Sequence, residues 1–120
     1  MTIPLKQPQE IEVWYVLPAV RRELVLALQE QGLNQKAIAQ LLNITEPAVS
    51  QYCNDKRGKE ITFTPIVKSY IKQSAQKITN PQSAYHQIQQ ITYFMKETKA
   101  LCKIHMAIES GLQGCDLCYK

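Results

Sequence analysis

The stretch from Leu33 to Cys53, LNQKAIAQLLNITEPAVSQYC, constrains the fold more than any other part of the chain. Its apolar residues recur at helical spacing in two short runs, which are separated by the segment around Asn43. Asn34 and Thr45 are good N-cap residues, and each stands directly before one of the runs. Asn43 tolerates a left-handed backbone better than other non-glycine residues, which suits a sharp turn. The pattern therefore predicts two short helices joined by a tight turn.

This pattern meets the packing demands of a helix-turn-helix. Ala39 is small where the second helix would cross the first, and Val49 and Tyr52 are apolar anchors that face back. The longer stretch EVWYVLPAVRRELVLALQEQGLNQKAIAQLLNITEPAVSQY, followed by a KRG loop, resembles the XRE (lambda-repressor-like) helix-turn-helix family. Within it, the chain is similar to small prokaryotic regulators with a cysteine-containing C-terminal tail. The resemblance covers residues 12–60 and implies a transcriptional regulator that binds double-stranded DNA, although most members carry glycine where this chain has Asn43.

In such motifs the recognition helix lies in the major groove, and its outward residues reach base edges. Glutamine can form two hydrogen bonds with adenine, and serine can serve either base type. Glu46 could accept a hydrogen bond from cytosine or could stabilise the helix N-terminus. The expected base-reading residues are Thr45, Glu46, Ser50, Gln51 and Asn54. The expected phosphate-binding residues, which would set the register on DNA, are Gln35, Lys36, Lys56, Arg57 and Lys59.

A second feature is the spacing C-x2-H-x9-C-x2-C in the last nineteen residues. One helical face can present its first two members, and glycines before the final pair let the backbone fold back. Such an arrangement suits a Cys3His zinc site, whereas an iron–sulfur cluster would prefer a fourth thiolate. The other interpretations of these cysteines are a thiol redox pair and a terminus without a functional role. The candidate metal ligands are Cys102, His105, Cys115, Cys118 and Cys53.

Cys53 stands at the end of the expected recognition helix. If it joined a cluster, oxidation or loss of that cluster would move the helix that reads DNA, and the protein would be a redox sensor. The alternative is that Cys53 is a small, partly buried hydrophobic residue.

The composition limits which classes of protein this chain can belong to. The 120 residues are 45% hydrophobic, which is ordinary for a globular protein, and no apolar run approaches the ~20 residues that a membrane span needs. The N-terminus lacks a secretory signal, so we expect a cytoplasmic protein without a disulfide framework. The net charge of +4 comes wholly from residues 63–120, because basic and acidic residues balance in residues 1–62.

The remaining sequence is also predicted to be mostly helical. We expect a polar arm over residues 1–10, a short strand or extended segment over residues 11–16, and a helix that ends at Gly32. A helix begins at Thr64–Pro65, and another begins at Asn80–Pro81 and runs to about Glu109. Two apolar stripes would form either a dimer interface or intrachain core. They are Ile66, Val67, Tyr70 and Ile71 in one helix, and Ile88, Ile91 and Met95 in the other.

The sequence thus predicts an all-α protein of about five helices. Residues 1–62 would form the DNA-binding region, and residues 63–120 a helical region for dimerisation with the cysteine cluster. The expected partners are DNA and a second copy of the chain, with no membrane and no evident small-molecule substrate. No catalytic arrangement stands out, so we expect no enzyme. The alternative is a protein-interaction module, antitoxin-like or an adaptor, with a structural zinc.

Overall fold

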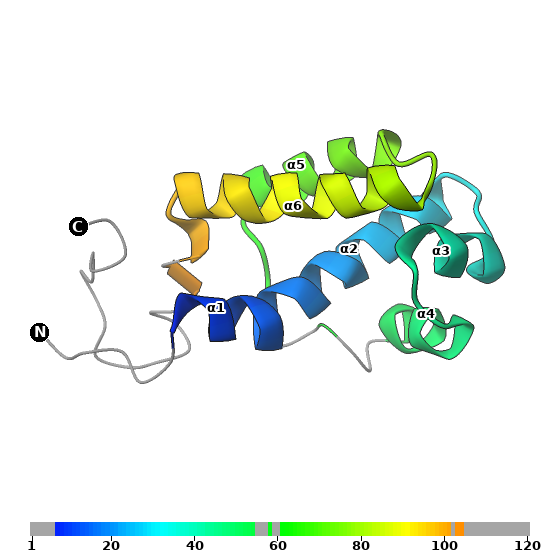
Figure 1. Cartoon of the computed structure of the whole chain (residues 1–120), viewed down its shortest axis with the longest axis horizontal. Coiled ribbons are helices and arrows are strands. Elements are labelled where there is room, and N and C mark those ends of the chain that lie inside the picture. The colour runs from blue at the N-terminus through cyan, green and yellow to red at the C-terminus, as the bar shows by residue number, and fades with distance from the viewer. Residues whose placement is uncertain (1–6, 55–57, 59–60, 102, 105–120) are drawn as a thin grey trace, which may run out of the picture.

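The computed structural model describes residues 7–54, 58, 61–101, 103 and 104 (Figure 1). These residues form helices and turns, with no strand among them, and the prediction of an all-α fold is confirmed. The first helical segment is continuous and comprises α1 (Pro8–Ile11), η1 (Glu12–Val16) and α2 (Leu17–Glu30). Four further helices follow within the described part of the chain. They are α3 (Gln35–Leu42), α4 (Glu46–Cys53), α5 (Pro65–Gln76) and α6 (Pro81–Glu97).

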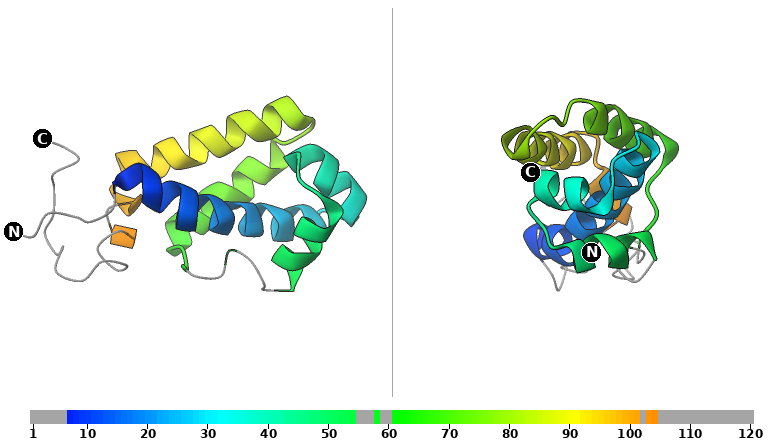
Figure 2. Two further views of the ribbon diagram at one scale, coloured as in Figure 1. Left: turned by 60° about the horizontal axis from the view of Figure 1, so that its bottom comes forward. Right: turned by 90° about the vertical axis from the view of Figure 1, so that its right-hand side faces the viewer.

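Helix α2 lies at the centre of the molecule. Seen along the long axis, α2 lies between α4 on one side and α5 and α6 on the other (Figure 2). Helix α3 packs against α4, α2 and α6. The buried side chains of all these helices form one core, whose fully buried members include Leu24, Leu28, Ile38, Val49, Ile71 and Ile91. None of the described helices is long and apolar enough to cross a membrane.

The start of the chain differs from the prediction. Residues 8–10 belong to α1 rather than to an arm, because Glu10 Oε1 accepts a hydrogen bond from the Gln7 N–H at 2.9 Å and Pro8 occupies the first turn. Residues 12–16 form a π-helical turn rather than a strand, and the Leu17 N–H donates to the Glu12 carbonyl five residues back. In a regular α-helix the Pro18 ring would clash with the carbonyl four residues earlier, and the wider turn precedes this proline.

One prediction in the C-terminal region is also wrong. Helix α6 ends at Glu97 instead of continuing to about residue 109. The Thr98 hydroxyl donates to the Phe94 carbonyl at 2.8 Å, and Lys99 adopts a left-handed backbone with φ of 60°. This break returns the chain toward the core, where Leu101 is buried.

The apolar stripe of α5 is narrower than expected. Val67 and Ile71 are buried, and Tyr70 stacks on Phe94 of α6 with 4.1 Å between the ring centroids. Ile66, by contrast, is 72% exposed, because the buried side of α5 runs through positions 67, 71, 74 and 75. The second stripe, on α6, does contribute Ile91 and Met95 to the core, while Ile88 is half-buried against it.

Candidate nucleic-acid interface

Helices α3 and α4 are joined by a three-residue turn whose local hydrogen bonds agree with the sequence prediction. The Asn34 side chain caps α3 by accepting a bond from the Ala37 N–H at 2.8 Å. Asn43 adopts φ of 55° and ψ of 46°, the left-handed conformation expected of it. The Ile44 N–H donates to the Ala39 carbonyl at 3.0 Å and closes the turn. These bonds fix where α4 begins relative to α3.

The inner face of α4 is apolar and holds the helix against the core. Ala48, Val49 and Tyr52 are buried, with Tyr52 only 3% exposed. The Thr45 hydroxyl oxygen accepts a hydrogen bond from the Ala48 N–H at 3.2 Å and caps the first turn. The outer face of α4 is therefore turned to solvent as a rigid surface, because its opposite face is fully packed.

The outer face of α4 is polar. It carries the residues expected to point outward, of which Glu46 and Asn54 are exposed and Ser50 and Gln51 are half-buried. The Asn54 amide nitrogen donates to the Ser50 hydroxyl oxygen at 3.3 Å, a pairing that the sequence analysis did not anticipate. Within the described residues the Gln51 side chain makes no hydrogen bond, so both its amide donor and its acceptor are available to a ligand.

The candidate phosphate-binding residues are only partly described. Gln35 and Lys36 lie exposed in the first turn of α3. Lys56, Arg57 and Lys59 lie outside the described residues. Thr45 and Glu46 are exposed at the start of α4, where a carboxylate interacts favourably with the helix dipole.

Gly58 has a role that the sequence analysis missed. It is buried, and its φ of +73° is in the left-handed region. A Cβ at this position would overlap the Pro18 carbonyl and press on Cβ of Arg22, both on α2. The absence of a side chain therefore allows Gly58 itself to lie directly on α2. The available signal was a glycine inside the polar, basic run NDKRGK, where a lone glycine often marks a close approach of two backbones.

The predicted metal site cannot be placed, because Cys102, His105, Cys115 and Cys118 lie outside the described residues. Cys53 is described, and its thiol is free and half-buried at the end of α4. No three potential metal ligands cluster among the residues that the structure describes. Helix α4 and the described residues 100, 101, 103 and 104 lie toward opposite ends of the long axis (Figure 1).

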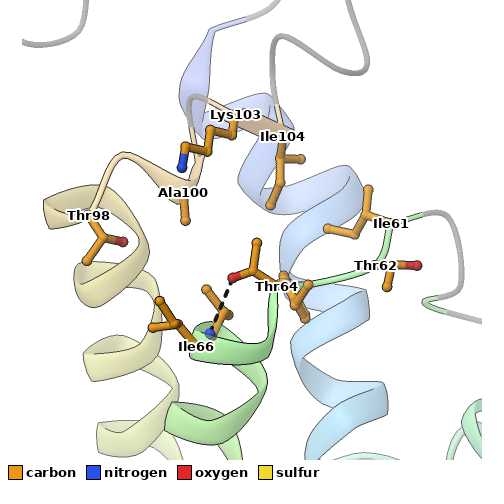
Figure 3. A pocket seen from close by; sticks show the side chains of 10 residues that line it. Ile61, Thr62, Thr64, Ile66, Thr98, Ala100, Lys103 and Ile104 are labelled. Carbon is orange, nitrogen blue, oxygen red and sulfur yellow. Dashed lines mark hydrogen bonds between the residues drawn. The ribbon is translucent and has the colours of Figure 1, made fainter.

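A pocket of about 470 Å³ lies where α5 begins and α6 ends (Figure 3). Its walls are largely apolar and include Ile61, Ile66 and Ile104. The Thr64 hydroxyl oxygen, on its floor, already accepts the Val67 N–H at 3.5 Å as the cap of α5. The exposed Ile66 in this wall is a candidate contact residue for the predicted homodimer. Dimerisation itself stays a prediction.

Comparison of the chain with protein-family models, with curated proteins and with solved structures gives no match. The resemblance to XRE regulators therefore rests on the residues quoted above.

Proposed function

We propose that this protein is a sequence-specific DNA-binding regulator of the XRE type, in which α4 enters the major groove. The observation that carries the proposal is the two-sided character of α4. Its inner face is anchored by Val49 and Tyr52, while its outer face presents hydrogen-bonding side chains to solvent. A helix of eight residues is about 12 Å long, comparable to the width of the major groove.

The outer face of α4 has chemistry suited to base edges. The unbonded Gln51 amide can pair with adenine through one donor and one acceptor. Ser50 and Asn54 act as a unit, because the bond between them orients both. A uniformly basic surface would bind any duplex, whereas this face carries amides, a hydroxyl and one carboxylate. This composition favours discrimination between sequences over simple attraction to phosphate.

Gln35 and Lys36 of α3 supply the expected backbone contacts. The basic residues Lys56, Arg57 and Lys59, which follow α4 in the sequence, would add others. One helix in one groove gives modest affinity, so we propose that two copies bind half-sites about 34 Å apart. The proposed tail site for zinc or an iron–sulfur cluster would stabilise the protein or sense redox state. Metal and sulfide analysis of protein purified without oxygen distinguishes the two metals.

Selection of duplexes from a random library with the purified protein tests the proposal. We expect a recurrent motif, with two related half-sites if the protein binds as a dimer. The selected duplex should bind at least 1,000-fold more tightly than random DNA at physiological salt, at the lower end of the range for specific proteins. Binding that ignores sequence and vanishes at moderate salt would contradict the proposal and favour the protein-interaction alternative.

A further inference from the structure

A second groove, of about 590 Å³, lies at the junction of α2, α3 and α6. Its volume is within the range typical of small-molecule sites. The apolar part of its wall comes from three elements and includes Leu17, Leu41, Ile44 and Ile88. The groove also contains the turn between α3 and α4, through Asn43 and Ile44. It thus touches the segment that sets the position of α4.

The charge in this groove is unbalanced. Arg21 of α2 lies in the wall with its side chain half-buried. Within the part of the chain that the structure describes, Arg21 makes no ion pair and no hydrogen bond through its side chain. The lining contains no aspartate or glutamate. A partly desolvated guanidinium beside apolar side chains is best satisfied by an anion that can accept two hydrogen bonds.

The other polar groups in the lining fit the same ligand. Gln82, Tyr85 and Gln89 of α6 also line the groove and carry amide or hydroxyl donors. We infer that this groove binds a small amphipathic carboxylate, with its anionic head on Arg21 and its apolar body against Leu17, Leu41 and Ile88. Both parts of the ligand are required, because a bare anion would leave the apolar wall in water and an uncharged molecule would leave Arg21 unpaired.

The position of the groove gives the ligand a regulatory consequence, which rests on the proposed DNA-binding function. A molecule that contacts Ile44 and Asn43 binds differently when the α3–α4 turn shifts. By linkage, it must then favour one position of α4 over another. We infer that the carboxylate changes the affinity of the protein for its DNA site.

Titration of the full-length protein with octanoate tests the binding step without DNA. We expect saturable binding, with the backbone amide signals of Asn43 and Ile44 shifting in the NMR spectrum. Octan-1-ol and octylammonium, which have the same apolar chain, should bind at least tenfold more weakly. Arg21→Gln should weaken octanoate binding at least tenfold, while Lys68→Gln, an exposed charge loss on α5, should not. Equal binding of the three probes, or no saturable binding, would overturn the assignment even if Arg21→Gln failed to fold.

Fluorescence anisotropy with the selected duplex, with and without saturating octanoate, tests the regulatory step. We expect at least a fivefold change in the dissociation constant, and the Arg21→Gln variant should lose this change. Octanoate binding with an unchanged DNA affinity would overturn the regulatory step alone. A protein that binds octanoate and no specific duplex would instead contradict the proposed function, and the groove assignment would stand.

Discussion

Helices α4 and α5 contact opposite sides of α2, and both begin with a threonine cap followed closely by proline. Their exposed surfaces nevertheless differ. The outer side of α4 carries a half-buried serine and glutamine and is followed by an exposed asparagine, whereas α5 exposes an isoleucine and two lysines beside a serine and a glutamine. The exposed residues of α5 are Ile66, Lys68, Ser69, Lys72 and Gln73. The common cap determines where each helix starts, and the outward residues determine what each surface can bind. The comparison predicts that equal damage to the two helices has equal structural but unequal functional effects.

The largest effect should come from removing the anchor of α4. Tyr52→Ala deletes a side chain that is only 3% exposed, and truncation of a buried aromatic residue costs about 3–5 kcal/mol of unfolding free energy. Tyr85→Ala is the matched control, because Tyr85 is 73% exposed and its loss should cost less than about 0.5 kcal/mol. Urea unfolding measures the loss of unfolding free energy in both variants. Similar losses in the two variants would mean that α4 is not packed as described.

Two glycines in different connections of the fold offer a sharper pair of variants. Gly58 and Gly32 both have positive φ, at 73° and 94°, so alanine should cost about 1–2 kcal/mol of backbone strain at either position. At Gly58 the added methyl group would also collide with Pro18, whereas the space around Gly32 is open. Gly58→Ala should therefore destabilise the protein more than Gly32→Ala in the same unfolding assay. The reverse order would show that Gly58 does not lie against Pro18 of α2 as described.

The two threonine caps test the comparison directly. Thr45→Ala and Thr64→Ala each remove a hydroxyl that accepts a backbone N–H, and each should lower the unfolding free energy by about 1 kcal/mol. Only Thr45→Ala should also weaken binding to the selected duplex, because Thr45 precedes the proposed reading helix. An equal loss of DNA affinity in both variants would indicate that general stability, and not the α4 surface, controls binding.

The smallest effect concerns Glu12 in η1, outside both helices. Burial raises the pKa of its carboxyl above the ordinary value, and the positive charge of Lys96 partly opposes this rise. The protonated form is therefore favoured by folding, and Glu12 contributes stability at low pH that is lost as pH rises through the raised pKa. Glu12→Gln should slightly stabilise the protein at pH 7 relative to wild type, and this advantage should disappear at pH 3. Urea unfolding curves of both proteins at pH 7 and pH 3 measure the difference in unfolding free energy. A stabilisation by Glu12→Gln that grew as the pH fell would contradict the raised pKa of Glu12.

Prediction from sequence succeeded where a few neighbouring residues decide the structure. The cap at Asn34, the left-handed Asn43 and the cap at Thr45 all depend on bonds within four or five residues. The π-helical turn before Pro18 and the break at Lys99 were missed. An apolar pattern of five residues cannot distinguish a strand from a widened helical turn, and a lysine gives no sign that its backbone is left-handed.

In the candidate site, too, the features set by nearby residues were predicted and those set by distant contacts were not. The outward positions of α4 follow from helical periodicity once its buried face is known, and they were predicted. The Ser50–Asn54 bond depends on the rotamers of both side chains, and the contact of Gly58 with α2 joins residues 36 to 40 positions apart in sequence. Neither could be derived from spacing. The groove at Arg21 brings together three helices that no local pattern connects.

The most direct test of the central claim is the effect of Gln51→Ala on discrimination between the selected duplex and random DNA. Gln73→Ala, an exposed glutamine on α5, is the control. If Gln51 makes a bidentate contact with a base, its loss should cost about 1–3 kcal/mol of specific binding and leave binding to random DNA unchanged. Gln73→Ala should behave as wild type. Undiminished discrimination by Gln51→Ala, or an equal loss in both variants, would contradict the assignment of α4 as the helix that reads DNA.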